Sequence, residues 1–140
     1  MRLYVDTSAL IKRYIEEPGS DSKHLSLIED ATEMVASVIL SPELLGVLRR
    51  AFSAGRISET SAVAVIEEFE RNQRDFHWYL VDEPLRDVAT AIGWRTGSRG
   101  MDSIHLATAQ KAEAECFLTA DKRQHEAALE LGLHSILIEV

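Results

Sequence analysis

The sequence predicts an α/β fold with a parallel sheet of about five strands flanked by helices on both faces, in three α/β/α layers. Short apolar runs alternate along the chain with longer segments of helical periodicity. These runs, such as Leu3–Val5 and Cys116–Leu118, are continuously apolar, which is typical of strands buried on both faces. Because the 140 residues contain no repeat, low-complexity tract or linker, we expect one domain over residues 1–140.

The first quarter of the chain is expected to hold two strands and two helices. Residues 3–5 form the first strand, which runs directly into a helix whose apolar residues continue from Ala9 and which Pro18-Gly19 closes. Residues 20–30 are polar with a few apolar positions, which fits a short surface helix. The second buried strand is expected at residues 34–37, so the chain begins with two strand–helix units.

A pair of helices is expected to follow as an antiparallel hairpin inserted between strands. Ser41 is a candidate N-cap and Pro42 suits the first helical position. Ser58 is the candidate cap of the second, longer helix. We therefore expect the hairpin to consist of residues 42–54 and 58–74.

The rest of the chain alternates strands with helices. Further strands are expected at residues 77–81, 115–119 and 135–138. Helices are expected to begin near Leu85, Asp102 and Asp121. The helix from Asp102 has small residues on several sides, which predicts burial almost all round, and Arg95–Gly100 before it reads as a loop.

The composition restricts the class of protein. A net charge of −8 argues against a protein that grips nucleic acid through its overall charge, although it leaves local basic patches open. The single cysteine, Cys116, permits no internal disulfide, which fits a reducing compartment. Asp6 interrupts the apolar start, so no secretory segment is visible, and no apolar run approaches the roughly 18 residues of a membrane helix. We expect a cytoplasmic protein without a membrane partner.

Acidic residues stand where a parallel sheet places its ligands. Asp6 and Asp121 each follow a strand, at the carboxyl edge where open α/β sheets bind ligands. Asp102 begins the buried helix, and Glu43 lies in the first turn after Pro42. Each acid alone has a structural explanation as a helix cap or a partner of the helix dipole. Asp82 shows that position alone does not identify a catalytic acid, because it also follows a predicted strand and has no other sign of a chemical role.

Together these acids predict a metal site. Four carboxylates at one edge would repel one another strongly in a partly desolvated cleft, and a divalent cation removes that conflict. Hard oxygen ligands without paired histidine or cysteine favour Mg²⁺ or Mn²⁺ over zinc. Such a site supports attack of activated water on a phosphodiester. The predicted ligands, which are also the predicted catalytic residues, are Asp6, Glu43, Asp102 and Asp121.

The acids lie in blocks that resemble the signature of the PIN-domain family, in particular the VapC toxins of toxin–antitoxin pairs. In chain order the blocks are Val5-Asp6-Thr7-Ser8-Ala9-Leu10, Ser37 with Glu43-Leu44 six residues on, Asp102-Ser103-Ile104-His105-Leu106-Ala107-Thr108-Ala109, and Leu118-Thr119-Ala120-Asp121. The resemblance spans nearly the whole chain, and its third block is the most specific. One departure is Ser103, where the family often has alanine.

The resemblance implies a function and partners. Members are Mg²⁺- or Mn²⁺-dependent endoribonucleases that typically act on structured RNA and are held inactive by an antitoxin. Their metal-binding acids fall on the four acids above. It also implies that the helical hairpin, with Phe52, Phe69 and Phe76 on or beside it, serves homodimer formation and antitoxin docking.

Several neighbouring residues are candidates for supporting roles. Thr7, Ser8 and Thr119 stand beside the acids, where they would orient a carboxylate or a water molecule, or simply cap a helix. His105 is expected to be a buried histidine with a hydrogen-bond partner, because zinc motifs require a second histidine. Trp78 and Trp94 are expected in the core, in preference to stacking on bases.

Basic residues near the acids would contact RNA phosphates or serve only as solvated charges. They are Lys12, Arg13, Arg95, Arg99, Lys122 and Arg123. For each of them taken alone, solvated surface charge is the expected role.

Three other functions compete with that of a nuclease. A phosphatase with Asp6 as its nucleophile usually needs a second acid two residues on, where this chain has Ser8. A phosphoacceptor signalling domain needs adjacent acids after the first strand and an acceptor aspartate after a later central strand, and Ser37 at the end of the second strand does not supply it. A non-catalytic binding protein of the same fold would have no need of all four acids.

Overall fold

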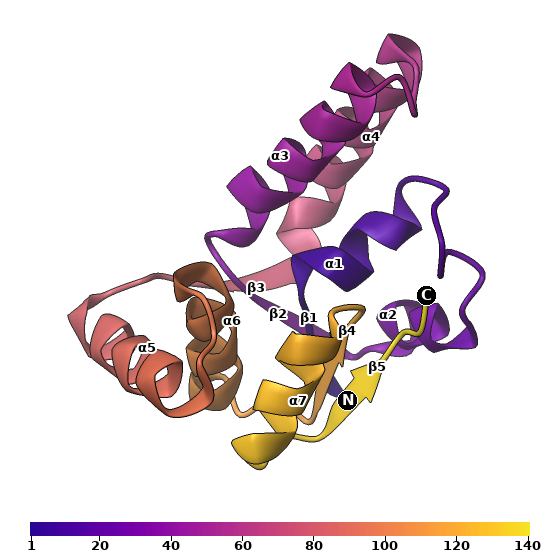
Figure 1. Ribbon diagram of the computed structural model, residues 1–140. Coiled ribbons are helices and arrows are strands. Elements are labelled where there is room, and N and C mark those ends of the chain that lie inside the picture. The colour runs from indigo at the N-terminus through magenta and orange to yellow at the C-terminus, as the bar shows by residue number, and fades with distance from the viewer.

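The computed structural model describes residues 1–140 and contains one five-stranded sheet in which every strand pair is parallel. The strand order is β3-β2-β1-β4-β5 (Figure 1). The strands are β1 (Arg2–Val5), β2 (Glu33–Ser37), β3 (Phe76–Tyr79), β4 (Cys116–Thr119) and β5 (Ser135–Leu137). The predicted parallel sheet is therefore confirmed, and every strand lies within two residues of its expected position.

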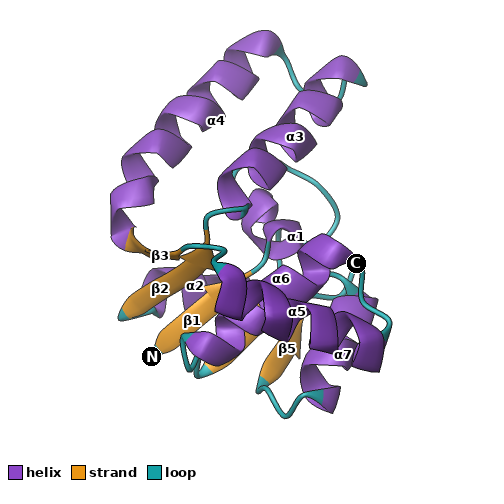
Figure 2. Ribbon diagram, turned by 90° about the vertical axis from the view of Figure 1, so that its left-hand side faces the viewer, coloured by secondary structure: helices purple, strands orange, loops and turns teal.

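Helices flank the sheet on both faces (Figures 1 and 2). The α-helices are α1 (Thr7–Leu10), α2 (Ser26–Asp30), α3 (Leu40–Ser53), α4 (Glu59–Asn72), α5 (Glu83–Thr96), α6 (Gly100–Lys111) and α7 (Lys122–Glu130). Short 3₁₀ turns are η1 (Ile11–Arg13), η2 (Lys23–Leu25) and η3 (Gln73–Asp75). The expected hairpin is present as α3 and α4, which project together away from the sheet. No helix combines the length and the apolar character needed to cross a membrane.

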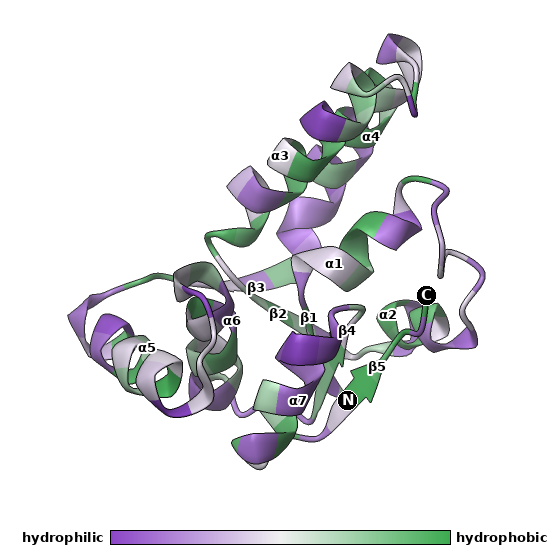
Figure 3. Cartoon of the chain, in the orientation of Figure 1, coloured by the Kyte–Doolittle hydropathy of each residue, from purple (hydrophilic) through white to green (hydrophobic).

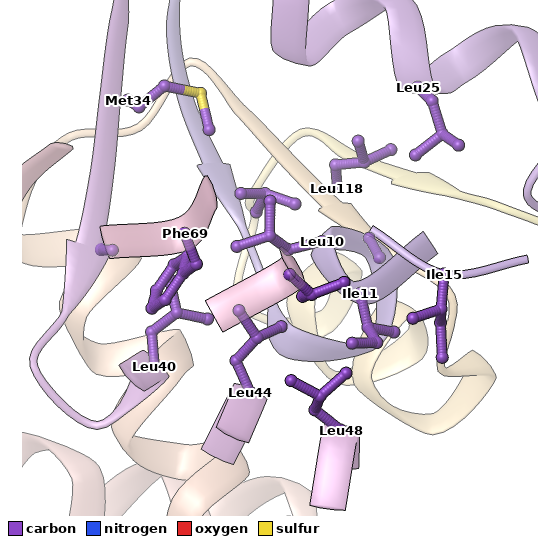
Figure 4. Close-up of a cluster of buried hydrophobic side chains, with 14 of the residues drawn as sticks. Leu10, Ile11, Ile15, Leu25, Met34, Leu40, Leu44, Leu48, Phe69 and Leu118 are labelled. Carbon is purple, nitrogen blue, oxygen red and sulfur yellow. The ribbon is translucent and has the colours of Figure 1, made fainter. Parts of the chain in front are cut away.

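Two hydrophobic clusters lie on opposite faces of the sheet. Leu3 and Val5 of β1 point into a cluster with α1, α3 and α4 (Figure 4). Tyr4, between them, points to the other face, into a cluster with α5, α6 and α7. Because successive strand residues point to opposite faces, a strand that serves two clusters must be apolar throughout. The continuous apolar runs of the sequence have this cause.

The first helix is shorter than expected. It is α-helical only to Leu10 and then tightens into the 3₁₀ turn η1. Ile11 and Ile15 are nevertheless buried, because apolar spacing reports the buried face and not the type of turn.

The start of α3 also differs from the prediction. The helix begins at Leu40, and Ser41 makes no cap bond to the helix backbone. Its hydroxyl instead accepts a bond from Gln73 at 3.4 Å. Pro42 still lies in the first turn, where its missing N–H leaves no helical bond unmade. Ser58 caps α4 as expected.

The connection between α5 and α6 is shorter than the predicted loop. Gly97, with a φ of +76°, ends α5, and α6 begins at Gly100, so Asp102 is the third residue of its helix and not its first. The two helices approach closely at Gly93, where an added Cβ would lie 3.0 Å from the Ser103 hydroxyl. This close contact explains the small residues of α6, which is buried on several sides as predicted.

The aromatic residues fall into two groups. Phe69 is core, while Phe52 and Phe76 are partly buried against it, so the hairpin exposes less aromatic surface than the sequence suggested. Hydrophobic segments recur along both hairpin helices (Figure 3).

Trp78 is partly buried, but Trp94 is 93% exposed, so the prediction of a core position is wrong for Trp94. Trp94 follows buried Ile92 by two residues, which turns it to the solvent face of α5.

Candidate active site

All four predicted acids line one cleft at the carboxyl edge of the sheet. The cleft has a volume of about 400 Å³. Asp6 and Asp121 follow the neighbouring strands β1 and β4, while α3 and α6 contribute Glu43 and Asp102. Strand β1 pairs with β2 on one side and β4 on the other, so the connections diverge here, as they do where open α/β sheets bind ligands.

Asp6 is held by hydroxyl groups and is only 5% exposed. Its Oδ1 accepts bonds from the Ser8 hydroxyl at 2.7 Å and the Ala9 backbone N–H at 3.2 Å. Its Oδ2 accepts a bond from the Thr119 hydroxyl at 2.5 Å. Burial raises the pKa of Asp6, although these donors partly oppose the effect. Asp6 thus caps α1 and lines the cleft at the same time.

Glu43 is held through one of its two oxygens. Oε1 accepts bonds from the Thr7 hydroxyl at 2.9 Å and from His105 Nε2 at 2.5 Å. Burial is the largest single influence and acts to raise the pKa of Glu43, but His105 and the Thr7 hydroxyl together outweigh it, and the pKa lies below its ordinary value. His105 is buried with a hydrogen-bond partner, as the sequence predicted.

Asp102 and Asp121 form the opposite side of the cleft. The Asp102 carboxylate accepts no hydrogen bond, and burial followed by the negative charge of Asp121 raises its pKa. Oδ1 of Asp121 caps α7 by accepting bonds from the backbone N–H groups of Arg123 and Gln124. The cap explanation therefore applies to Asp121 but not to Asp102.

Gln124 links two segments of the site through a contact that the sequence did not reveal. It is 2% exposed, and its Nε2 donates to the Asp102 carbonyl at 3.0 Å. This bond ties the start of α7 to the first turn of α6, and with them Asp121 to Asp102. Its only sequence signal is a polar residue three and four positions before Ala127 and Ala128, on the same helical face, and that signal names no partner.

The residues present fit a small hard cation. No three acidic, histidine or cysteine side chains stand close enough together to form a complete ligand cluster. Mg²⁺, however, keeps several water ligands and is commonly held by one or two carboxylates. Oxygens that accept no hydrogen bond remain on Glu43 (Oε2), Asp121 (Oδ2) and both positions of Asp102. This oxygen-only set favours Mg²⁺ or Mn²⁺ over zinc.

A polar groove of about 660 Å³ adjoins the cleft and shares Asp102 and Asp121 with it. It runs between the α5–α6 connection and the start of α7, whose first residues are strongly hydrophilic (Figure 3). The groove also contains Arg99, Lys122 and Arg123, none of which forms an ion pair. On the other side, Arg50 of α3 lines the cleft, a position that the sequence did not single out.

The remaining basic candidates are engaged elsewhere. Lys12 has a side chain only 7% exposed and pairs with Glu17 at 2.7 Å. Arg13 pairs with Glu29, and Arg95 bonds to Glu130. Arg99, Lys122 and Arg123 are therefore the predicted cations that remain unpaired beside the acids.

The fold and the cleft define a class of α/β protein that gathers carboxylates at the ends of its central parallel strands. The sequence profile of the PIN domain matches residues 3–130, and the chain belongs to the PIN-domain family. Ribonuclease VapC35 of Mycobacterium tuberculosis is 33% identical over 137 residues, which cover 94% of this chain and 93% of that protein.

Solved structures share the fold at low sequence identity. FitAcB from Neisseria gonorrhoeae superposes with a TM-score of 0.72 at 17% identity, covering 96% of each chain. A toxin–antitoxin complex from Klebsiella pneumoniae gives a TM-score of 0.65 at 16% identity, covering 87% of this chain and 88% of the other. The three-layer PIN-like fold predicted from the sequence is confirmed.

Proposed function

We propose that this protein is an endoribonuclease toxin of a toxin–antitoxin pair, dependent on Mg²⁺ or Mn²⁺ and acting in the cytoplasm as a single domain. The observation that carries the proposal is the convergence of Asp6, Glu43, Asp102 and Asp121, from distant segments, on one cleft. The 33% identity to a protein named as a ribonuclease, over nearly the whole chain, supports the same reaction.

The proposed reaction is hydrolysis of an RNA phosphodiester. A divalent ion bound at the acids would supply activation of water and stabilisation of the leaving oxygen. The water oxygen forms a bond to phosphorus while the bond to the 3′-oxygen breaks. The new oxygen stays on the 5′-phosphate, and a proton ends on the 3′-hydroxyl. Asp102 and Asp121 would offer such an ion oxygens that accept no hydrogen bond, while donors fix Asp6 and Glu43 in place.

Basic residues on both sides of the acids suit an RNA strand crossing the cleft. Arg99 and Lys122 lie in the adjoining groove, and Arg50 lies on the opposite side. We propose that they neutralise phosphates that flank the scissile bond. These local positive charges would attract RNA to the cleft in spite of the net charge of −8, which opposes RNA binding elsewhere on the surface.

Protein partners are part of the proposal. The α3–α4 hairpin projects from the sheet and exposes apolar side chains, among them Leu45 (38%) and Val63 (47%). An amphipathic antitoxin helix is suited to such a surface. We propose antitoxin docking here and association of two copies of the chain as a homodimer.

The alternative of an Asp6 phosphatase is disfavoured by the surroundings of Asp6. Such an enzyme usually needs a second acid two residues after its nucleophile. Here that position holds Ser8, whose hydroxyl donates to Asp6 Oδ1 and so does not supply the acid.

The test is to map RNA ends after brief induction in cells. The proposal predicts new 5′-phosphate and 3′-hydroxyl ends at defined sites, together with growth arrest. Co-expression of the small protein encoded beside the gene should relieve that arrest. Ends with a 2′,3′-cyclic phosphate, or no new RNA ends, would contradict the proposed reaction.

A further inference from the structure

A chain of hydrogen bonds links the core of the protein to the acidic cleft. It runs from Tyr4 of β1 through His105 of α6 to Glu43 of α3. We propose that His105 is a positioning residue, which fixes the Glu43 carboxylate so that only Oε2 is offered to a cation. This inference rests on the proposed function, because it takes Glu43 to be a metal ligand.

The chain is rigid at its inner end. The Tyr4 side chain is fully buried and stacks on Phe117, with ring centroids 5.4 Å apart and planes inclined by 7°. Its hydroxyl lies 2.5 Å from His105 Nδ1, and His105 itself is 2% exposed. The imidazole is thus held in position by Tyr4 independently of its bond to Glu43.

The direction of the bond to Glu43 follows from donor and acceptor chemistry. An ionised carboxylate only accepts, so Nε2 must carry a hydrogen. In the neutral ring, Nδ1 then accepts from the Tyr4 hydroxyl, and in the charged ring Nδ1 donates to it. Nε2 donates to Glu43 in both states, so the arrangement does not depend on the protonation of the ring.

The consequence concerns the two oxygens of Glu43. Oε1 accepts from both His105 and Thr7, while Oε2 accepts no hydrogen bond. Glutamate has much rotamer freedom to lose on metal binding, and this bonding removes most of it beforehand. Glu43 is therefore prepared as a ligand through one oxygen.

A matched pair of variants tests the proposal. The amide nitrogen of His105→Gln reaches the position of Nε2, whereas the shorter His105→Asn retains a partner for Tyr4 but falls short of Glu43. We expect Mn²⁺ affinity, measured by calorimetry, to fall about 10- to 100-fold in His105→Asn, with much of it restored in His105→Gln. The metal concentration for half-maximal cleavage of a structured RNA should move in parallel.

The control is Ser103→Ala, on the same helix and equally buried at 2% exposure, whose hydroxyl bonds only to the Ser98 carbonyl. It should bind Mn²⁺ as the wild type does. Thermal unfolding reports stability separately. Equal Mn²⁺ affinity in His105→Asn and wild type would overturn the proposal, even if His105→Asn were less stable.

Two further results complete the test. If His105→Asn does not fold, His105→Gln is compared with His105→Met, whose side chain has a similar length but no N–H donor for Glu43. His105→Met should bind Mn²⁺ more weakly, and equal affinity in the two variants would overturn the proposal. A wild-type protein that cleaves RNA without divalent ions contradicts the proposed function itself. If the wild type requires Mn²⁺ and the His105 variants reach half-maximal cleavage at the same Mn²⁺ concentration as the wild type, only the role of His105 is contradicted.

Discussion

The two sides of the acidic cleft are built differently. On one side, Asp6 and Glu43 are held by hydroxyl, imidazole and backbone donors that belong to the core of the fold. On the other, Asp102 accepts no hydrogen bond, and Asp121 uses one oxygen to cap α7. The first side is fixed by the protein, and the second is left open toward the polar groove.

Glu43 and Asp102 differ in their electrostatics for the same reason, whereas burial raises the pKa of Asp6 in spite of its donors. Donors from His105 and Thr7 lower the pKa of Glu43 despite its burial, whereas burial and the charge of Asp121 raise the pKa of Asp102. A cation would relieve the repulsion on the second side without disturbing the bonds of the first. Under the proposed function, the fold would prepare Asp6 and Glu43 as ligands and leave Asp102 and Asp121 to be ordered by the metal and the substrate.

The largest expected effect comes from removing a carboxylate on either side. Asp6→Asn or Asp102→Asn should reduce RNA cleavage at least about 100-fold, because each variant loses a proposed metal ligand. Unfolding should remain cooperative, because each change also removes a charge that repels the other acids. Asp82→Asn is the matched control, since Asp82 also follows a strand and caps a helix but lies outside the cleft. Wild-type rates in either cleft variant would refute the assignment.

The two sides should respond oppositely to loss of a polar group. Thr119 is fully buried, donates to Asp6 and accepts from the Asp121 backbone N–H. Thr119→Val should therefore lower the free energy of unfolding by about 1–3 kcal/mol. Metal-free Asp102→Asn should instead melt higher than the wild type, because its charge is unfavourable in the fold. Calorimetric melts in EDTA measure the stability of both variants. If Thr119→Val were more stable than the wild type, the expected opposite response of the two sides would be refuted.

The pH dependence of stability follows from the signs of the pKa shifts. Because folding raises the pKa of Asp102, its contribution is most favourable at low pH and is lost as pH rises through that pKa. Because folding lowers the pKa of Glu43, its contribution is present above the ordinary value of 4.5 and is lost as pH falls. In denaturant titrations, Asp102→Asn should gain relative stability with rising pH and Glu43→Gln should lose it. Parallel curves for the two variants would contradict these signs.

A smaller effect is expected from the groove. The double variant Arg99→Ala with Lys122→Ala should weaken RNA binding and reduce the salt slope by about 0.7 for each phosphate that is no longer neutralised. Binding is best measured in the inactive Asp102→Asn background, at several salt concentrations. Arg56→Ala, an exposed cation in the α3–α4 connection, should leave the slope unchanged. Equal slopes for all three proteins would exclude the groove as the RNA path.

The smallest expected effect concerns Trp94. With 93% of the residue exposed, Trp94→Ala should change the free energy of unfolding by no more than about 0.5 kcal/mol. A larger loss in a denaturant titration would show that the indole packs in solution.

The sequence predicted what local patterns encode. Continuous apolar runs identified the parallel strands, and the position of Asp6 and Asp121 after two of them placed both at the carboxyl edge. The bond between His105 and Glu43 joins residues 62 positions apart, and no local signal names such a partner. The exposure of Trp94 was missed because the prediction relied on the apolar residue type. The helical period places residue 94 away from the face that buries Ile92.

The most direct measurement is cleavage of a structured RNA by purified protein as divalent ions are removed and restored. Oxygen ligands from four segments around one cleft predict cleavage in Mg²⁺ or Mn²⁺, none in EDTA, and recovery when the metal is returned in excess. The contradicting result is cleavage by the wild type that is undiminished in EDTA but abolished by Asp102→Asn. It would show that the acids act without a metal.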